Sequence, residues 1–256
     1  MTAVRFAAQL VICLVMLHAA DASFARSGDS KSAGKEEAAG IEYATRWDPR
    51  VGGPASAEET LKVLGLAAKH REAFDIQYFD LPLAAPASDV KRILRKRVSH
   101  GKVEWTYKYR GRSELPSNAP PCPLDIAADW KDEVDVSVFF ESVASTAAGS
   151  SAARQPTTTR GFSRSCSVKS AEAARIPLGG IARPCSSSMR RVETEKFNIE
   201  QWTLPGGSSV IEVSMKGADV PATAEYFFAR VVQPLSKVAG FAPDSRSKTE
   251  MGSECK

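Results

Sequence analysis

Two short segments combine basic side chains with the alternation of a β-strand. Segments 94–97 and 106–110 read as adjacent antiparallel strands, and successive side chains of a strand point to opposite faces. One face of each segment is basic and the other is aromatic or aliphatic. The basic residues are Arg95, Arg97, Lys108 and Arg110.

These four cations allow two interpretations. In an open sheet they would form a solvated face with weak cross-strand ion pairs. In a sheet closed into a barrel they would line a cationic interior suited to phosphate oxygens. Four like charges on one sheet face repel one another unless a counter-charge is present, so we favour an anion-binding site.

Acidic residues occur in strand-like segments as well. They are Glu42, Glu133, Asp135 and Glu212. Their oxygens could hold a divalent cation such as Mg²⁺. Alternatively, they could neutralise the basic strands through internal salt bridges. From the residues alone we favour the salt bridges. Lys216 and Lys248 either add donors at the mouth of the same site or are surface lysines.

Composition gives no support for a nucleic-acid partner. The formal net charge is +4 over 256 residues, too small an excess to indicate a nucleic-acid partner. The aromatic residues at strand spacing are expected in the core rather than as platforms for bases. They are Trp105, Tyr107, Tyr109 and Trp202.

The first 25 residues read as a secretory signal peptide. Arg5 precedes an apolar run over residues 6–20, and small residues follow as cleavage sites. The run is shorter than the ~20 residues that span a membrane. We therefore expect a secreted or periplasmic protein with no membrane span after cleavage.

Four cysteines remain after residue 25, and an oxidising compartment favours disulfides. They are Cys122, Cys166, Cys185 and Cys255. Three pairings are possible; we favour Cys166–Cys185, which closes a short loop, together with Cys122–Cys255. No C-x-x-C pair occurs, and only His70 and His100 remain in the mature chain, which argues against zinc and against Cys–His or Ser–His–Asp catalysis.

The rest of the chain is interpreted as one domain over residues 41–256, after a flexible segment at 26–40. A capping box at Ser56 and Glu59 predicts a short helix. Strands are predicted at 74–80, 134–140, 197–204 and 210–216, the last two joined by a Gly-rich turn. Residues 222–238 fit an amphipathic helix that Pro234 should bend. Residues 144–159 are interpreted as a loop and residues 161–189 as an irregular segment held by a disulfide. We therefore expect an insertion around 141–189.

The order of these motifs resembles the CYTH, or triphosphate tunnel, superfamily. The matching motifs are Glu42, Tyr78-Phe79-Asp80-Leu81-Pro82, Leu94-Arg95-Lys96-Arg97, Thr106-Tyr107-Lys108-Tyr109-Arg110, Glu133-x-Asp135, Ile211 to Lys216 and Ser247-Lys248-Thr249. That superfamily forms an antiparallel eight-stranded tunnel in which basic residues hold a triphosphate and carboxylates hold a divalent metal. The resemblance implies an α+β fold with an antiparallel β-barrel and flanking helices.

The resemblance also implies a site. Its ligand-binding residues would be Arg46, Arg95, Arg97, Lys108, Arg110, Lys216 and Lys248, and its ligands to Mg²⁺ or Mn²⁺ would be Glu42, Glu133, Asp135 and Glu212. The sequence departs from the superfamily's E-x-E-x-K signature, because Ala44 stands at the second carboxylate of Glu42-x-Ala44-x-Arg46. The last strand likewise offers Ser214 where an acidic residue is common.

These departures shape the expected function. We expect an exported protein that binds a phosphate-rich anion, of the polyphosphate or triphosphate type, in a cationic tunnel. Weak metal-dependent phosphohydrolase activity is the lesser expectation. The alternative is a non-catalytic envelope or secreted protein that retains the fold for structure or partner binding. Neither the ligand nor the oligomeric state follows from the sequence.

Overall fold

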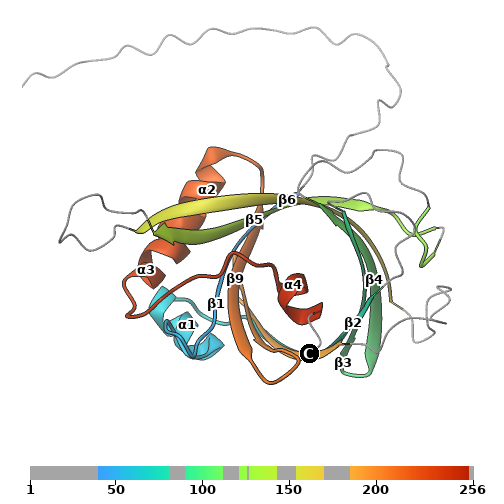
Figure 1. Cartoon of the computed structure of the whole chain (residues 1–256), viewed down its shortest axis with the longest axis horizontal. Coiled ribbons are helices and arrows are strands. Elements are labelled where there is room, and N and C mark those ends of the chain that lie inside the picture. The colour runs from blue at the N-terminus through green and yellow to red at the C-terminus, as the bar shows by residue number, and fades with distance from the viewer. Residues whose placement is uncertain are drawn as a thin grey trace, which may run out of the picture. The chain divides into compact units, whose positions relative to one another are not determined.

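A closed β-barrel dominates the computed structural model, which describes residues 40–80, 90–111, 121–125, 127–142, 154–169 and 185–253. Its strands are β1 (Gly40–Trp47), β2 (His70–Asp80), β3 (Lys91–Ser99), β4 (Lys102–Gly111), β5 (Lys131–Ser142), β6 (Arg154–Lys169), β7 (Cys185–Glu193), β8 (Asn198–Thr203) and β9 (Ser209–Gly217). They pair in the order β1-β5-β6-β4-β3-β2-β7-β8-β9. Figure 1 shows the barrel that they close. The expected barrel with flanking helices is confirmed.

One strand pair departs from the antiparallel pattern. β1 and β5 run parallel, with Glu42 opposite Asp135, whereas the other neighbours are antiparallel. The register places the acidic residues of both strands on the same face, because side chains of paired residues lie on one side of a sheet. This pairing positions part of the candidate site.

The outer wall of β1, β5 and β7–β9 packs against helices. α1 (Ala57–Leu64) begins at Ser56, whose side chain accepts a hydrogen bond from the Glu59 N–H, and ends at Gly65 in the left-handed conformation, as the capping box predicts. Apolar residues of the strands, such as Ile41 and Val213, bury against α1 and the C-terminal helices.

The predicted helix at 222–238 is three consecutive segments. They are α2 (Pro221–Phe227), the π-helical η1 (Phe228–Val232) and α3 (Gln233–Ser236). The Gln233 N–H donates to the Phe228 carbonyl five residues earlier. Pro234 follows directly and has no N–H to donate, so the local widening of the helix lies at the point where proline disfavours a regular turn.

The barrel interior is apolar at one end. Ile76, Trp202 and Val210 pack there with Met251 of α4 (Lys248–Ser253), which contacts β2 and β7. Figure 1 shows α4 across the barrel opening. A Cβ on Gly252 would lie 2.8 Å from the Tyr78 ring, so only glycine allows this close approach of α4 to β2.

Two segments differ from the sequence prediction. Residues 154–169 and 185–193 form β6 and β7 and pair with neighbours on both sides, instead of a loop and a disulfide-held excursion. β6 escaped prediction because its inward side chains are serines, so it lacks the apolar alternation by which strands are recognised. The Gly-rich hairpin between β8 and β9 is confirmed, with Gly206 and Gly207 both at φ 84°.

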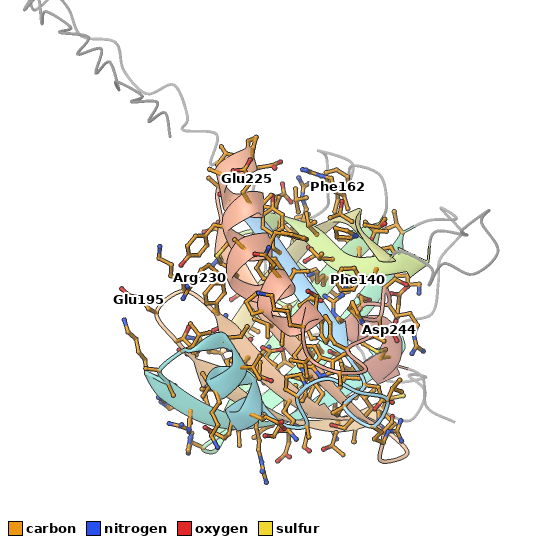
Figure 2. The ribbon with its side chains drawn as sticks, turned by 90° about the vertical axis from the view of Figure 1, so that its left-hand side faces the viewer. Phe140, Phe162, Glu195, Glu225, Arg230 and Asp244 are labelled. Atoms are coloured by element: carbon orange, nitrogen blue, oxygen red, sulfur yellow. A yellow bond between two sulfur atoms is a disulfide. The ribbon has the colours of Figure 1, made fainter. Side chains whose placement is uncertain are left out.

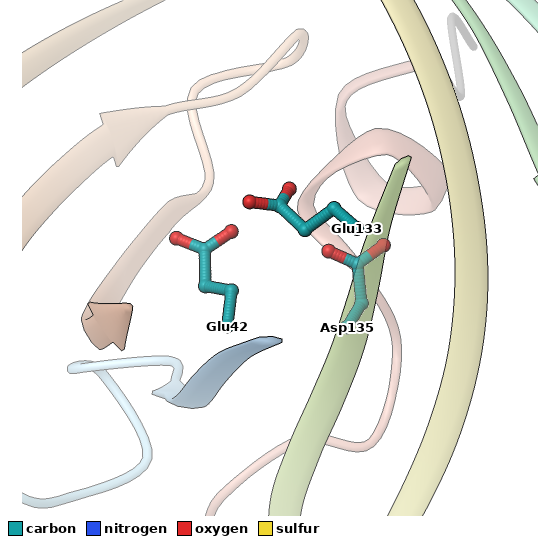
Figure 3. Close-up of side chains that lie close together, drawn as sticks. All are labelled: Glu42, Glu133 and Asp135. Carbon is teal, nitrogen blue, oxygen red and sulfur yellow. The ribbon is translucent and has the colours of Figure 1, made fainter. Parts of the chain in front are cut away.

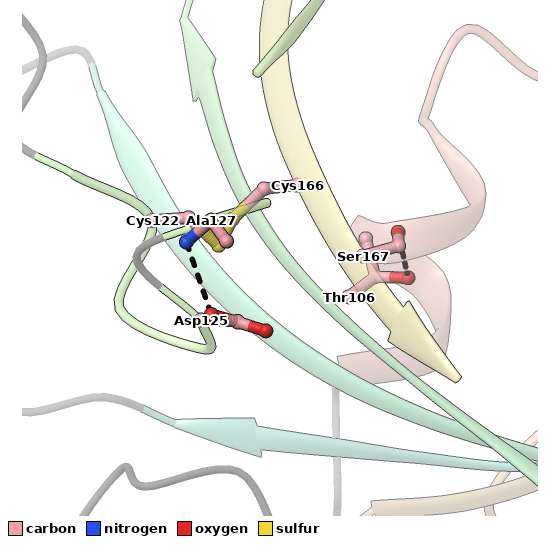
Figure 4. Close-up of a disulfide and its surroundings, with 6 residues drawn as sticks. All are labelled: Thr106, Cys122, Asp125, Ala127, Cys166 and Ser167. Carbon is pink, nitrogen blue, oxygen red and sulfur yellow. Dashed lines mark hydrogen bonds between the residues drawn. A yellow bond between two sulfur atoms is a disulfide. The ribbon is translucent and has the colours of Figure 1, made fainter. Parts of the chain in front are cut away.

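The favoured disulfide pairing is wrong. Cys122 is bonded to Cys166 (Figure 4), and Cys185 is disulfide-bonded as well, while Cys255 lies outside the described residues. The Cys122–Cys166 bond holds residues 121–125 against an outer cluster that includes Trp105 and Tyr107 of β4. The pairing of β6 with β4 brings Cys166 next to Tyr107. The number of residues between two cysteines does not reveal such a contact.

The signal peptide (1–25) and the flexible segment (26–40) lie outside the described residues except for Gly40, which begins β1, and they remain predictions. Within the described ranges, no helix is long and apolar enough to cross a membrane.

Candidate anion and metal site inside the barrel

A cavity of about 320 Å³ lies within the barrel. At this level of the barrel, alternation along the strands turns mostly polar side chains inward, while the outward apolar side chains of β1, β5, β8 and β9 face the helices. Eight cationic and five acidic side chains line it: Arg46, Arg95, Arg97, Lys108, Arg110, Arg191, Lys216, Lys248, Glu42, Glu133, Asp135, Glu200 and Glu212. The cavity thus has an excess of three positive charges when all are ionised.

The acidic side chains are concentrated on one side of the barrel, together with three of the eight cations, Arg46 of β1, Lys216 of β9 and Lys248 of α4. The acidic side chains come from β8, β9, β1 and β5, which are consecutive in the strand order, and the opposite wall of β4, β3 and β7 supplies only basic ones. Between the walls, β6 contributes the hydroxyls of Ser165 and Ser167, and Ser167 is 3.0 Å from Thr106 Oγ1. One side of the cavity therefore suits an anion and the other a cation.

Arg95 and Arg97 on β3 are the least neutralised cations of the basic wall. The Nε atoms of both are buried and have no hydrogen-bond partner among the described residues. Among the described residues, the side chain of Arg95 donates to Thr106 Oγ1, at 3.3 Å from Nη2. Arg97 is 3.9 Å from Glu104. A buried N–H group without an acceptor destabilises the folded protein. An anion that accepts hydrogen bonds from Arg95 and Arg97 would therefore bind favourably here.

An aromatic ring supports the same wall. Phe74 on β2 lies 4.9 Å from the Arg97 guanidinium and 5.2 Å from that of Arg191. Cations over a ring face are attracted by its quadrupole. Burial, together with the nearby charges of Arg95 and Arg191, lowers the pKa of Arg97 to about 10, which leaves it protonated at neutral pH.

Lys108 and Arg110 on β4 face both walls. Asp135 lies 3.1 Å from Arg110 and 3.6 Å from Lys108. Burial lowers the pKa of Lys108 despite the nearby Asp135 carboxylate. Burial also opposes ionisation of Asp135, but the two cations outweigh it and lower the pKa of Asp135. Both cations thus reach the acidic cluster as well as the cavity.

Three carboxylates converge on the acidic wall. One oxygen from each of Glu42, Glu133 and Asp135 lies within 4.8 Å of the others (Figure 3). Burial raises the pKa of Glu42, and the charges of Glu212 and Glu133 raise it further. Asp135 Oδ2 is buried and is the oxygen that contacts Arg110 and Lys108. An oxygen-only set of this kind fits Mg²⁺ or Mn²⁺.

Glu212 stands apart from this cluster. It is fully buried and lies 2.6 Å from Arg46 Nε and 2.6 Å from Lys248 Nζ. Arg46 also donates to Ser137 Oγ at 2.8 Å. Because cations of the chain already neutralise Glu212, it is less suited to a metal than Glu42, although the sequence grouped the two.

Glu200 and Arg191 are site residues that the sequence analysis missed. Arg191 Nη2 lies 2.7 Å from Glu200 Oε1, and Lys248 Nζ lies 2.7 Å from Oε2. Burial opposes ionisation of Glu200, but Lys248 and Arg191 hold its pKa well below the ordinary value. A single acidic residue in a short strand forms no sequence motif. The available signal was the spacing of two residues between Glu200 and Trp202, which places both side chains on one face of the strand.

The position of the missing carboxylate is occupied by small side chains. Ala44 lines the cavity and pairs with Ser137 on β5 and Ser214 on β9. Asn198 pairs with Ser214 on the next strand. This layer supplies no charge, so the acidic ligands are confined to the neighbouring layer at Glu42 and Asp135.

All seven predicted anion-binding residues and all four predicted metal ligands line one cavity. Lys216 contacts Glu133 at the exposed edge, with 65% of its side chain exposed, whereas Lys248 is 24% exposed. Lys248 therefore belongs to the interior and is not a surface lysine. Their roles in binding stay predictions.

Comparison with known proteins finds no matching family model and no significantly similar curated protein. Solved structures do match. A conserved hypothetical protein from Pyrococcus furiosus is 11% identical, with a TM-score of 0.44 over 82% of this chain and 99% of that chain. The PH1819 protein from Pyrococcus horikoshii OT3 is 11% identical, with a TM-score of 0.43 over 82% and 96%.

HpAC1 from Hippeastrum, described as having a dominant triphosphatase activity, is 11% identical, with a TM-score of 0.41 over 82% of this chain and 92% of that chain. Values this low assign neither an activity nor a ligand to this chain. The closed barrel itself agrees with the tunnel fold that the resemblance to the CYTH superfamily implies.

Proposed function

We propose that this protein binds a linear phosphate chain, of the triphosphate or polyphosphate type, inside the barrel. The buried Nε atoms of Arg95 and Arg97, which lack acceptors among the described residues, are the observation that carries the proposal. Phosphate oxygens would accept their N–H groups in charge-assisted hydrogen bonds. Lys108 and Arg110 would neutralise further oxygens from β4.

The acidic wall complements this arrangement. Glu42, Glu133 and Asp135 would hold one Mg²⁺ or Mn²⁺, and the ion would supply charge neutralisation and orientation of phosphate oxygens. Ala44 contributes no ligand, and Glu212 is already paired with Arg46 and Lys248. We therefore rank binding above catalysis and expect slow hydrolysis or none.

If hydrolysis occurs, the chain's own part in it is electrostatic. Arg95, Arg97 and Arg191 would stabilise negative charge on the transferred phosphoryl group, because fixed donors in a buried site need no reorganisation. Water would be the nucleophile, since the described cavity lining contains no histidine that could activate the hydroxyls of Thr106, Ser165 or Ser167.

The alternative is a non-catalytic secreted or envelope protein that keeps the barrel for stability or partner binding. The internal pairing of Glu200 and Glu212 with Arg191, Arg46 and Lys248 favours it. In that case the ion pairs are structural and the cavity holds only solvent ions. Both proposals include export, which rests on the signal peptide.

Isothermal titration with sodium tripolyphosphate separates the two. Anion binding in the cavity predicts saturable 1:1 heat, an affinity that falls between 50 and 500 mM salt, and only a modest change on adding Mg²⁺. A phosphate-release assay run alongside should show little turnover. Absence of binding at low salt would overturn the proposal, and rapid Mg²⁺-dependent turnover would reverse our ranking of binding over catalysis.

A further inference from the structure

Cys185 is disulfide-bonded, and the sequence leaves few candidates for its partner. The chain contains five cysteines. Cys122 and Cys166 bond to each other, and Cys13 lies in the predicted signal peptide. Cys255, two residues after the end of α4 and outside the described residues, is the cysteine that remains.

The described residues bring Cys185 close to α4. Cys185 begins β7 and pairs with Tyr78 on β2, and side chains of paired residues lie on one side of a sheet. Gly252 of α4 approaches the Tyr78 ring so closely that a Cβ on it would lie 2.8 Å away, and Met251 is buried in one cluster with Cys185. Cys255 follows Gly252 by three residues, and three extended residues span up to about 10 Å, which puts Cys185 within reach of the end of the chain.

Contacts with β1 fix the segment before α4. The Asp244 N–H donates to the Arg46 carbonyl at 2.7 Å, and Arg46 Nη1 donates to the Arg246 carbonyl at 3.2 Å. Figure 2 shows Asp244 past the end of the helical segments that carry Glu225 and Arg230. These contacts hold the chain where α4 begins, so a bond after its last turn would fix the other end.

α4 carries a cation that neutralises buried carboxylates of the barrel. Lys248 Nζ lies 2.7 Å from Glu200 and 2.6 Å from Glu212. Burial opposes ionisation of Lys248, but the two carboxylates outweigh it and raise its pKa. α4 has six residues, and a helix shorter than about 12 residues is marginal in water on its own. The position of Lys248 therefore depends on what holds α4 in place.

We propose that a disulfide between Cys185 and Cys255 ties the end of α4 to β7 and thereby positions Lys248 between Glu200 and Glu212. The bond forms when the two thiols give up two protons and two electrons to an exported oxidant of the disulfide class, which is reduced to a dithiol. With both ends of α4 fixed, Lys248 stays one of the eight cations that line the cavity. This role of the disulfide is independent of anion binding, because the ion pairs of Lys248 form without a ligand.

Peptide mapping of the non-reduced full chain by mass spectrometry tests the bond. It should identify a pair of peptides that joins Cys185 to Cys255. A bond from Cys185 to any other cysteine, or a free thiol at Cys255, would overturn the proposal. The measurement uses wild-type protein, so its result stands even where a cysteine variant fails to fold.

Lysine acetylation with an N-hydroxysuccinimide ester, quantified at each residue by mass spectrometry, tests the positioning of Lys248. In wild type, Lys248 should react slowly because its ammonium lies in two ion pairs with buried carboxylates, and the exposed Lys237 should react fast. In the double variant Cys185→Ser/Cys255→Ser, local opening of α4 should acetylate Lys248 at least about tenfold faster and leave Lys237 within about twofold of wild type.

Cys122→Ser/Cys166→Ser is the matched control, since it removes the disulfide that holds residues 121–125 to the outer wall. Lys248 should react in this variant as slowly as in wild type. If loss of the Cys185 bond leaves the reactivity of Lys248 unchanged, or if both double variants raise it equally, the positioning role is refuted. Titration with tripolyphosphate decides the proposed function separately.

Discussion

The ammonium of Lys248 lies 2.6 Å from the carboxylate of Glu212, which is fully buried. Lys248 begins α4, and the same nitrogen lies 2.7 Å from Glu200. One cation from the C-terminal part of the chain thus neutralises two carboxylates from neighbouring strands. The acidic wall is built around an internal cation, and this arrangement separates Glu200 and Glu212 from the cluster at Glu42.

Lys248→Met should destabilise the protein strongly. The variant keeps the length of the side chain but removes the shared cation, which leaves buried Glu212 with Arg46 and buried Glu200 with Arg191. Removing one partner of a buried ion pair costs up to about 3–5 kcal/mol. Urea unfolding measures the free energy of unfolding. Lys237→Met, at an exposed position after α3, is the control and should stay within about 0.5 kcal/mol; equal effects of both would refute the structural role of Lys248.

Arg95→Ala should weaken tripolyphosphate binding by about 10- to 100-fold. Arg95 has a buried Nε without an acceptor, and a hydrogen bond to a charged group contributes about 1.5–3 kcal/mol. Calorimetry gives the affinity of wild type and variant at the same salt. Arg71→Ala is the matched control on β2, because Arg71 pairs with Glu58 in an exposed contact outside the cavity. A comparable loss in both variants would show that Arg95 has no specific role.

The basic face was predictable and the acidic network was not, for a physical reason. Arg95 and Lys108 lie in strands whose other face is apolar, so the period of two is visible in the sequence. Glu200 and Arg191 meet through the pairing of β7 with β8, and Lys248 reaches them from a segment about 50 residues away. Such contacts depend on barrel closure and on the docking of α4, neither of which leaves a local pattern.

The disulfide pairing was predicted wrongly for the same reason, because it depends on the order of the strands in the barrel. Cys122 and Cys166 are 44 residues apart, and loop length favoured a closer pair. β6 lies between β4 and β5 in the barrel, which brings Cys166 to the wall that residues 121–125 cover. The sequence of β6 gave no sign of this position because serines line its inner face.

Glu42→Gln should stabilise the metal-free protein at neutral pH. Burial raises the pKa of Glu42 above 4.5 in the folded state, so the folded state holds its proton more tightly than the unfolded state does. As pH rises through 4.5 the wild type loses stability relative to the variant, until Glu42 is ionised in both states. Below pH 4.5 the two proteins should converge.

Urea unfolding of both proteins between pH 4 and pH 8, with a chelator present, measures this difference. Glu225→Gln, at an exposed position on α2, serves as the control and should show no pH-dependent gain. A Glu42→Gln variant that is less stable than wild type at pH 7 would contradict the inference that the ionised Glu42 side chain lowers the free energy of unfolding.

Ala44→Glu should strengthen divalent metal binding. Ala44 lines the cavity between Ser137 and Ser214, two residues along β1 from Glu42, and a carboxylate there would add an oxygen ligand beside the existing cluster. Calorimetry with Mn²⁺ should show a gain on the order of tenfold, and phosphate release from tripolyphosphate should become metal-dependent. Ala44→Gln has nearly the same size without the charge, so it separates charge from crowding. If Gln and Glu give the same affinity and neither variant hydrolyses tripolyphosphate, the missing carboxylate does not limit activity, and the non-catalytic alternative gains support.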